Sequence, residues 1–597
     1  MTSFQERLRV RLISLSQNPI KAIWIACTLI SMVYGVLVYA FVWHDNGKPR
    51  FERIIKSDGL GYYRYLPDIF ITNDIKNLPD DALHFAKVDG HNVNKYYVGT
   101  AISMLPFFTA AVIWEKSFGM ATDGRSPPFQ ITVSLAALFY FCFGLFLLGR
   151  LLIEQSFPLK WVLVTLFAIA FGTNLLTYSV ELPSMSHVYS WFWINAFFYA
   201  YTKLIHRNQK KWLMLCAFTF AMIVLIRPVN GLVLLVLPFL AGSTERFIES
   251  FKGAITHPWL LPAIILGLFI LSFQPIVWYL QAESLWVWSY QSEGFNFLSP
   301  QIIEVLVGFR KGWFIYTPLT LIAILGFYYL FRVNRFRFYS GIGFLAVLVY
   351  IISSWWNWYY GSSFGQRPFV EYYGFIGFLL VTVYSEVRAK PYRSFLMTLT
   401  GLFILLNMIQ AYQYRYEILS KTDMNFEKYV FAFLKTDRKY SQSIGGFVEA
   451  IPYAANPSLE YTATLGYTST KATGDGIDLS GAEYGATHDI LLQPQMITDR
   501  GFYLKLDMKR KEHAQYASDN AMLVVEYKTQ ANETYGQQYF KLNDYPRTQF
   551  GEWHDLEFGI VLTPPDSTSD FIRIFVWNRD RAPFTIGDYQ IRLYSIN

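Results

Sequence analysis

One carboxylate stands in an unusual setting near the start of the chain. The segment "IIKSDGLGYYRYLPDIF", residues 54 to 70, follows the first long apolar run and contains Asp58 in what reads as a glycine-flanked loop. Polar groups held at the edge of a membrane are costly, so Asp58 is a functional candidate. Gly59 and Gly61 would let the backbone approach a ligand closely.

The aromatic residues that follow could bind a sugar or a lipid. Tyr62 and Tyr63 offer flat faces that stack on sugar rings or line a lipid groove. The alternative interpretation is a structured loop with an aromatic belt at the membrane interface.

A second group of candidates consists of cations in external loops, where Lys and Arg are expected to be rare. Arg227, Arg310, Lys311 and Arg367 each lie at the end of a predicted membrane segment. A lipid-linked phosphate is a natural partner, because arginine binds its oxygens bidentately while the apolar tail lies between helices. The alternative for each of them is contact with lipid headgroups.

A histidine and an acid flank a proline-containing break between two apolar runs. In "ELPSMSH", Glu181 opens the break and His187 closes it. An imidazole at this position could bind phosphate, bind a hydroxyl or pass a proton. The alternative is a structural histidine at the start of a helix.

The composition that surrounds these residues is that of a membrane protein. Of 597 residues, 53% are hydrophobic, 19% are aromatic and only 16% are charged, which is outside the range of water-soluble globular proteins. The formal charge of +7 is small for this length and gives no support for nucleic-acid binding. Cys27, Cys142 and Cys216 lie inside apolar runs without metal-ligand spacing, so we interpret them as packing residues.

Eleven helices are expected to span the membrane. They cover residues 22–43, 130–151, 159–179, 187–205, 212–226, 230–242, 258–280, 313–331, 339–356, 370–387 and 394–412. The distribution of Lys and Arg places the first large loop, residues 44–99, outside. The short apolar segment 99–114 has Pro106 in its middle, and we expect it to be re-entrant or interfacial.

The pattern changes after about residue 440. Alternating segments such as "FYLKLDMKRK" and "FIRIFVWN", separated by turn residues, predict a soluble all-β domain, built as a two-sheet sandwich or jelly roll. We therefore expect a transmembrane domain at 1–412, a linker at 413–440 and a β-sandwich at 441–597.

Six motifs together resemble the GT-C superfamily of integral membrane glycosyltransferases, which includes dolichyl-phosphate-mannose-dependent and bacterial aminoarabinose transferases. In chain order they are "SDGLGYY", "NKYYVGTAISMLPFF", "ELPSMSHVYSWF", "LIRPVNGL", "RKGWFIYTPL" and "WWNWYYGSSFGQRPFVE". Their order along a helix bundle gives the set its specificity, and the resemblance covers most of residues 20–412. The terminal β domain resembles the carbohydrate-binding sandwiches appended to such enzymes.

The resemblance implies a role for each candidate. By position, Asp58 becomes the catalytic base. Many relatives carry paired acids here, whereas Asp58 stands alone, and a single carboxylate is a poor site for a hard cation. We therefore expect no metal or other cofactor and a monophosphate donor. The expected phosphate-binding residues are Arg227, Arg310, Lys311, Arg367, Lys95 and His187, and the expected substrate contacts are Tyr62, Tyr63, Glu181 and Gln366.

The sequence thus predicts an inverting glycosyltransferase of a bacterial inner membrane, with its active site and terminal domain in the periplasm. It would move a sugar from a lipid-linked donor to a glycan, lipid or protein acceptor. One alternative is a flippase or transporter for a lipid-linked saccharide, although such proteins commonly show two related halves and this sequence shows no duplication. Another is a glycan receptor in which the helices serve only as an anchor.

Overall fold

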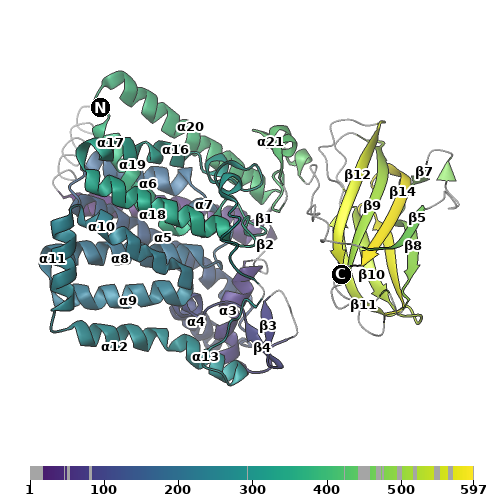
Figure 1. Ribbon diagram of the computed structural model, residues 1–597, viewed down its shortest axis with the longest axis horizontal. Coiled ribbons are helices and arrows are strands. Elements are labelled where there is room, and N and C mark those ends of the chain that lie inside the picture. Colours follow the sequence, from purple (N-terminus) through teal and green to yellow (C-terminus); the bar gives the residue numbers. More distant parts are fainter. Residues whose placement is uncertain are drawn as a thin grey trace. The chain divides into compact units, whose positions relative to one another are not determined.

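A computed structural model gives the architecture of the chain (Figure 1). It describes residues 18–45, 48–49, 51, 54–79, 84–291, 293–422, 424–441, 458–464, 472–473, 476–493, 496, 501–514, 521–542, 551–562 and 569–595. The chain forms two compact units. The first consists of Met1–Tyr360 and Phe364–Ala411, and the second of Gly361–Ser363 and Tyr412–Asn597.

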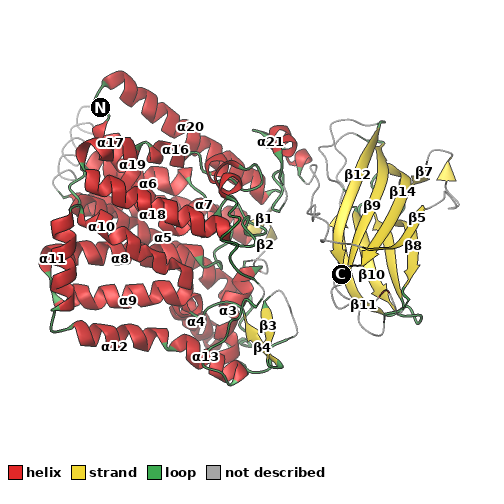
Figure 2. Cartoon of the chain, viewed as in Figure 1, coloured by secondary structure: helices red, strands yellow, loops and turns green. Residues whose placement is uncertain are grey.

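The first unit is almost entirely helical (Figure 2). Its helical segments are α2 (Pro19–Leu37), the π-helix η1 (Val38–Trp43), α3 (Asp58–Phe70), α4 (Gly99–Ser117), α5 (Pro127–Glu154), α6 (Leu159–Gly172), α7 (Leu175–Val180), α8 (His187–Arg207), α9 (Lys210–Ile226), the 3₁₀-helix η3 (Pro228–Val236), α10 (Leu237–Ala241), α11 (Thr244–Ile255), α12 (Leu260–Leu271), α13 (Phe273–Ala282), α14 (Ile302–Val307), α15 (Trp313–Tyr316), α16 (Leu319–Ile324), α17 (Gly326–Val333), α18 (Arg335–Ser354), the 3₁₀-helix η4 (Arg367–Tyr372), α19 (Tyr373–Glu386) and α20 (Lys390–Arg415). Two short hairpins, β1 (His44–Asp45) with β2 (Lys48–Pro49) and β3 (Phe85–Val88) with β4 (His91–Asn94), lie in the first large loop.

Within the described residues, six helical stretches are long and apolar enough to cross a membrane. They are Pro19–Trp43, Pro127–Glu154, Leu260–Ala282, Arg335–Ser354, Arg367–Glu386 and Lys390–Arg415. Three shorter apolar stretches are Leu159–Gly172, Pro228–Ala241 and Leu319–Val333. The expected helical membrane bundle is therefore present, and the number of eleven spans stays a prediction.

The longest helix, α5, packs against α2, α4 and α8. Aromatic rings fill the α5–α8 contact: Tyr140 packs edge-on against Tyr189 and Phe192, with ring centroids 5.0 and 4.9 Å apart. The apolar segment 99–114, which we expected to be re-entrant or interfacial, lies within the continuous helix α4 and does not turn back on itself. A proline in a helix interior removes one backbone hydrogen bond, but packing against α5 keeps α4 helical through Pro106.

The second unit carries two antiparallel sheets. Its elements are α21 (Phe426–Ala432), the 3₁₀-helix η5 (Arg438–Tyr440), β5 (Ser458–Thr464), β6 (Ala472–Thr473), β7 (Gly476–Asp478), β8 (Tyr484–Leu491), β9 (Phe502–Glu512), β10 (Met522–Lys528), β11 (Thr534–Lys541), β12 (Trp553–Leu562), β13 (Phe571–Trp577) and β14 (Phe584–Ser595). One sheet has the order β11-β10-β13-β8, and the other has β12-β9-β14-β7-β6 with β5 also on β14.

Alternate side chains of both sheets share one core. On β13, every second residue from Ile572 to Val576 is buried, and these side chains join the cluster that contains Leu504 and Leu506 of β9. This is the packing of two sheets face to face. The predicted β domain is present, while the jelly-roll connectivity and the domain limits stay predictions.

Candidate active site

Asp58 is the first residue of helix α3, not part of a loop as the sequence suggested. The preceding residue, Ser57, has a φ of 53° and turns the chain sharply into the helix. The backbone amides at a helix N-terminus favour a negative charge. The position of Asp58 therefore stabilises its ionised form.

The two glycines beside Asp58 serve packing inside the protein. A Cβ atom on Gly59 would clash with the side chain of Ser184, in the break before α8, and one on Gly61 would clash with the ring of Tyr96. The close approach that the structure shows at these glycines is to protein side chains, and the approach to a ligand stays a prediction. The glycines let α3 approach its neighbours and so fix the position of Asp58.

The Asp58 carboxylate is held by an arginine and a tyrosine. Its Oδ2 lies 2.8 Å from Nη2 of Arg367, the first residue of η4, and it accepts a hydrogen bond from the hydroxyl of Tyr96. Burial alone would raise the pKa of the carboxyl, but the charge and hydrogen bond of Arg367, with that of Tyr96, outweigh it. The pKa of Asp58 thus lies below its ordinary value of 3.8.

Arg227 is placed by a break between two helices. Helix α9 ends at Ile226, and Pro228 opens the 3₁₀-helix η3. A residue that precedes proline is driven out of the helical region, and Arg227 is extended, with φ −152° and ψ 112°. Because of this break, the backbone of Arg227 leaves the hydrogen-bonding pattern of helix α9.

A fully buried carboxylate, Glu371, joins Arg227 to His187. Its Oε1 accepts hydrogen bonds from Nη1 of Arg227 at 2.7 Å and from Nδ1 of His187 at 2.9 Å. Glu371 is 0% and His187 2% exposed, whereas the side chain of Arg227 is 21% exposed. The other oxygen of Glu371 has no hydrogen-bond partner among the described residues.

The two ion pairs belong to one cluster. Asp58 and Glu371 supply two negative charges, and Arg367 and Arg227 supply two positive charges, so the cluster has no net charge when His187 is neutral. Tyr62 is buried between them, close enough for its hydroxyl to interact electrostatically with Asp58 and both arginines. Residues from α3, α8, η4 and the α9–η3 break thus meet at one place.

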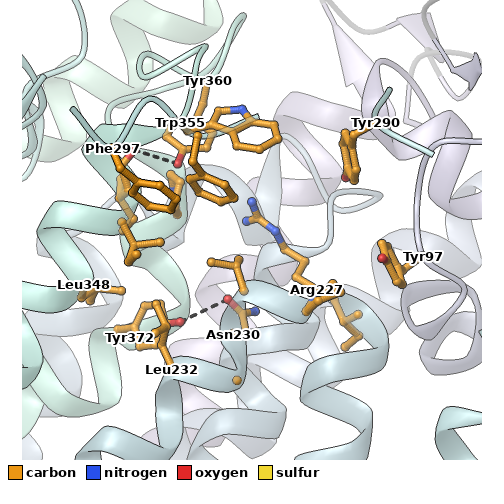
Figure 3. Close-up of a pocket in the computed structure, with 18 of the residues that line it drawn as sticks. Tyr97, Arg227, Asn230, Leu232, Tyr290, Phe297, Leu348, Trp355, Tyr360 and Tyr372 are labelled. Atoms are coloured by element: carbon orange, nitrogen blue, oxygen red, sulfur yellow. Dashed lines mark hydrogen bonds between the residues drawn. The ribbon is translucent and has the colours of Figure 1, made fainter. Parts of the chain in front are cut away.

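A cavity of about 380 Å³ adjoins this cluster. Its walls are largely apolar and include aromatic side chains such as Tyr97, Tyr290 and Trp355, and Arg227 is the only charged residue among the described residues that line it. Figure 3 shows the Arg227 side chain reaching into the space below Trp355 and beside Tyr290. A volume of this size is in the range of small-molecule sites, and the lining suits a ligand with one anionic group and an apolar part.

Two of the predicted phosphate-binding cations have contacts outside the cluster, and a third is buried. Lys95 forms an ion pair with Glu293 at 3.4 Å. The guanidinium of Arg310 lies over the ring of Tyr359, 3.4 Å from its centroid. Lys311 is 2% exposed. The described contacts do not place any of the three in the Asp58–Glu371 cluster.

Three predicted substrate contacts are also engaged elsewhere. Glu181 pairs with Lys56 at 3.2 Å. The hydroxyl of Tyr63 donates to the backbone oxygen of Gly124 at 2.7 Å. Gln366 is fully buried, and its Nε2 donates to the backbone oxygen of Trp358 at 3.2 Å. The cluster thus contains Asp58, Arg227, Arg367, His187 and Tyr62 of the predicted set.

Glu371 and Tyr96 are site residues to which the sequence analysis gave no role. Both lie inside motifs quoted above, Tyr96 in "NKYYVG" and Glu371 in "GQRPFVE". An acid within an apolar stretch, four residues after a candidate arginine, is the signal that could have identified Glu371, since buried carboxylates need a cationic partner. Tyr96 carries no comparable signal, because tyrosines are frequent throughout this chain.

No group of three or more His, Cys, Asp or Glu side chains with metal-binding geometry occurs among the described residues. Asp58 and Glu371 each have an arginine as partner instead. The expectation that the protein uses no metal or other cofactor stays a prediction.

Comparisons with known proteins add a limited set of likenesses. No protein-family profile matches the chain, and no curated protein sequence matches it. Among solved structures, it is similar to the oligosaccharyltransferase AglB of Archaeoglobus fulgidus, in complex with an inhibitory peptide and a dolichol-phosphate, with 12% identity and a TM-score of 0.41. That match covers 69% of this chain and 57% of AglB.

Two further structures give similar values. ArnT of Cupriavidus metallidurans matches with 12% identity and a TM-score of 0.41, covering 68% of this chain and 67% of ArnT. The arabinosyltransferase EmbB of Mycobacterium smegmatis matches with 10% identity and a TM-score of 0.36, covering 95% of this chain and 64% of EmbB. This chain thus spans between 57% and 67% of the length of these three structures.

Proposed function

We propose that the protein is an inverting glycosyltransferase that moves a sugar from a polyprenyl-phosphate donor to an acceptor hydroxyl at the outer face of the membrane. In a bacterium this would be the periplasmic face of the inner membrane. The acceptor would be a glycan, a lipid or a protein. The observation that carries this proposal is a cluster of two carboxylate–arginine pairs beside a cavity with aromatic and aliphatic walls.

The cavity fits a ligand that joins a sugar, a phosphate and a hydrocarbon. Tyr97, Tyr290 and Trp355 offer faces for a sugar ring or an isoprenoid chain. Arg227 presents the charge that a phosphate needs, and Glu371 holds the guanidinium through one of its nitrogens. The remaining nitrogens of Arg227 are the candidates for phosphate contact.

In the proposed step, Asp58 takes the proton of the acceptor hydroxyl. The acceptor oxygen forms a bond to the anomeric carbon as the bond from that carbon to the phosphate oxygen breaks, and the electron pair leaves with the phosphate. Attack from the opposite face inverts the configuration. Arg227 and Arg367 stabilise the negative charge that develops on the departing phosphate, a contribution that is often the largest in catalysis.

The Asp58–Arg367 pair links donor binding to the strength of the base. In the empty site Asp58 is a weak base, because its pKa is lowered by Arg367. A phosphate that binds Arg367 would compete with Asp58 for that cation and place a second negative charge beside the carboxylate. Both effects raise the affinity of Asp58 for a proton. Deprotonation of the acceptor would then require a bound donor.

His187 is suited to a hydroxyl rather than to a phosphate. The Glu371 carboxylate accepts from Nδ1, so the ring proton of a neutral His187 is assigned to that nitrogen and Nε2 is left as an acceptor. A phosphate oxygen is itself an acceptor. We therefore propose that Nε2 accepts a hydrogen bond from a hydroxyl of the sugar or acceptor.

The charge balance favours a donor with one phosphate. Because two carboxylates offset two arginines, the cluster has no surplus of positive charge. A donor with one phosphate diester carries about one negative charge, and a diphosphate donor carries about two negative charges. The cluster alone would have to neutralise the second charge as well. The same reasoning is consistent with Asp58 as the one carboxylate that α3 contributes to the cluster, because a single carboxylate is a poor ligand set for a divalent cation.

The test is transfer from a radiolabelled polyprenyl-phosphate sugar to candidate acceptors by the purified protein in lipid. Asp58→Asn should abolish turnover, a loss of at least about 10²- to 10⁴-fold for a general base. Asp68→Asn is the matched control, because Asp68 lies on the same helix but pairs with Arg64 at 2.9 Å. It should fold less stably and still turn over.

Three results would each contradict a part of the proposal. Near-normal turnover by Asp58→Asn would remove its assignment as the base. Movement of the labelled lipid across the bilayer without any transferred sugar, in the wild type, would favour the flippase or transporter instead. Equal binding of polyprenyl phosphate and polyprenyl diphosphate would remove the argument for a monophosphate donor.

A further inference from the structure

Helix α11 differs from the helices around it in direction and exposure. It runs across the ends of α8 and α9 in Figure 1, and no residue of it is buried. The sequence favours a stable helix here: the Ser243 side chain caps the first turn by accepting from the amide of Arg246 at 3.3 Å, and Lys252 lies in the last turn.

One face of α11 contacts the protein. The hydroxyls of Ser250 and Tyr201 of α8 are 3.0 Å apart. Gly253 faces the side chain of Asn208, the residue that ends α8, so closely that a Cβ on this glycine would lie 3.2 Å from the Asn208 amide nitrogen. These contacts hold α11 against the turn that joins α8 to α9.

The remaining surface of α11 divides into an apolar strip and a charged strip. Ile248, Phe251 and Ile255, spaced three and four residues apart, are 44%, 60% and 50% exposed. Such spacing places them on one helical face. Glu245 and Glu249 are exposed on another face. The helix therefore presents three different faces: one packed on the bundle, one apolar and exposed, and one charged and exposed.

The exposure of the next helix along the chain indicates what surrounds the apolar strip of α11. α11 leads through a short turn into α12, the first half of the candidate span Leu260–Ala282, and only 22% of an 18-residue apolar window of this span is buried. Leu261, Ile265 and Leu268 of α12 are 66%, 57% and 61% exposed, as a lipid-facing span requires. The exposed strip of α11 is thus continuous along the chain with a surface that faces hydrocarbon.

The junction between the two helices carries residues typical of the membrane interface. Trp259 is 41% exposed, and the ammonium group of Lys210 lies 4.9 Å from the centre of its ring. Tryptophan and lysine concentrate at the level of the lipid headgroups. α11 ends at this junction and runs across the direction of α8, α9 and α12 in Figure 1, which is the direction expected of a helix parallel to the membrane surface.

We propose that α11 is an interfacial helix whose strip of Ile248, Phe251 and Ile255 inserts into the headgroup–acyl boundary of the surrounding bilayer. Glu245 and Glu249 face water, and Ser250 and Gly253 face the bundle. The partner is bilayer lipid, and the proposal does not depend on the transferase activity. By the distribution of basic residues, this is the cytoplasmic leaflet.

Depth-dependent quenching tests this placement. Single cysteines at positions 248, 251 and 255, and at the control positions 245 and 249, are labelled with bimane in full-length protein from which Cys27, Cys142 and Cys216 have been replaced by alanine. The protein is reconstituted in nanodiscs of phosphatidylethanolamine and phosphatidylglycerol. Lipids with a nitroxide at acyl carbon 5 should quench the three strip positions at least threefold more than the controls, and aqueous iodide should do the reverse.

A second measurement keeps the native cysteines. A benzoylphenylalanine photoprobe in place of Phe251 should crosslink to lipid, identified by mass spectrometry, whereas the same probe in place of Glu249 should not. The proposal is overturned if strip positions are as open to iodide as position 249. It is also overturned if they are shielded from both quenchers, or if the probe at 251 crosslinks to a protein or a second copy of the chain.

Discussion

Asp58 and Arg367 determine how the site responds to acid. The pKa of Asp58 is lowered in the folded protein, so the pair stabilises the fold fully above the ordinary value of 3.8 and loses this contribution as the pH falls through the lowered pKa. Between about pH 5 and pH 8 the carboxylate stays ionised.

This gives a prediction for the pH dependence of stability. The melting temperature of wild type should show no transition from Asp58 between about pH 5 and pH 8. In Arg367→Gln, burial is no longer opposed by the cation, so the pKa of Asp58 should rise and stability should change with pH already in the weakly acidic range. Identical melting profiles of the two proteins would show that the ion pair does not control this carboxyl.

Glu371 and Arg227 allow the stability and the ligand affinity of the site to be separated. Arg227→Gln leaves a fully buried carboxylate without its cation, which typically costs about 3–5 kcal/mol. The double variant with Glu371→Gln removes the stranded charge, so the melting temperature should largely recover. Affinity for polyprenyl phosphate, measured by titration in detergent, should stay low in both, because the guanidinium that we propose to bind phosphate is absent. Recovery of affinity in the double variant would contradict the role of Arg227.

At the scale of elements, the close approach of α3 to the break before α8 positions the acid. Gly59→Ala should push α3 away from Ser184, cost about 1–3 kcal/mol as overpacking does, and reduce transfer because Asp58 moves with its helix. Adding Ser184→Gly removes the clashing side chain and should restore part of both losses. The measurements are melting temperature and labelled-product formation.

Gly343 supplies the matched control for this prediction. It lies in helix α18, and a Cβ on it would meet nothing within 4 Å. Gly343→Ala should be neutral or stabilising by up to about 1 kcal/mol, since alanine is the better helix former. If Gly59→Ala behaves like Gly343→Ala, the packing role of Gly59 is wrong.

The contrast between predicted and observed elements has a physical basis. Long apolar helices such as α5 follow from composition, because few other structures satisfy the backbone in a membrane. The sequence around Asp58 reads as a glycine-flanked loop, and two glycines and Pro67 do lower the helix propensity of α3. Tertiary packing overrides that propensity. At the site, charged residues near predicted membrane ends identified Asp58, Arg227 and Arg367 as candidates. A sequence does not show that the side chain of Glu371, on a 3₁₀-helix, contacts Arg227.

At the scale of the molecule, the site and the β-sheets belong to different compact units. Asp58, Arg227, Arg367 and Glu371 all lie in the first unit. Removing residues 441–597 should therefore leave the affinity for polyprenyl phosphate within about twofold of wild type, well under the tenfold change that corresponds to 1.4 kcal/mol. Acceptor choice or stability should change. Loss of lipid-phosphate binding in the truncated protein, with its melting temperature retained, would contradict this division of roles.

The ion pair between Asp58 and Arg367 has a consequence for selectivity. Without a ligand, Arg367 is already paired with the Asp58 carboxylate. A phosphate that binds Arg367 would therefore compete with a carboxylate of the same chain, whose effective concentration is high. Inorganic phosphate and nucleotides bring no hydrocarbon to offset that competition, whereas a polyprenyl chain gains free energy by leaving water. We expect the protein to bind abundant soluble phosphates weakly and to bind the scarcer phosphates that are anchored in the membrane more tightly.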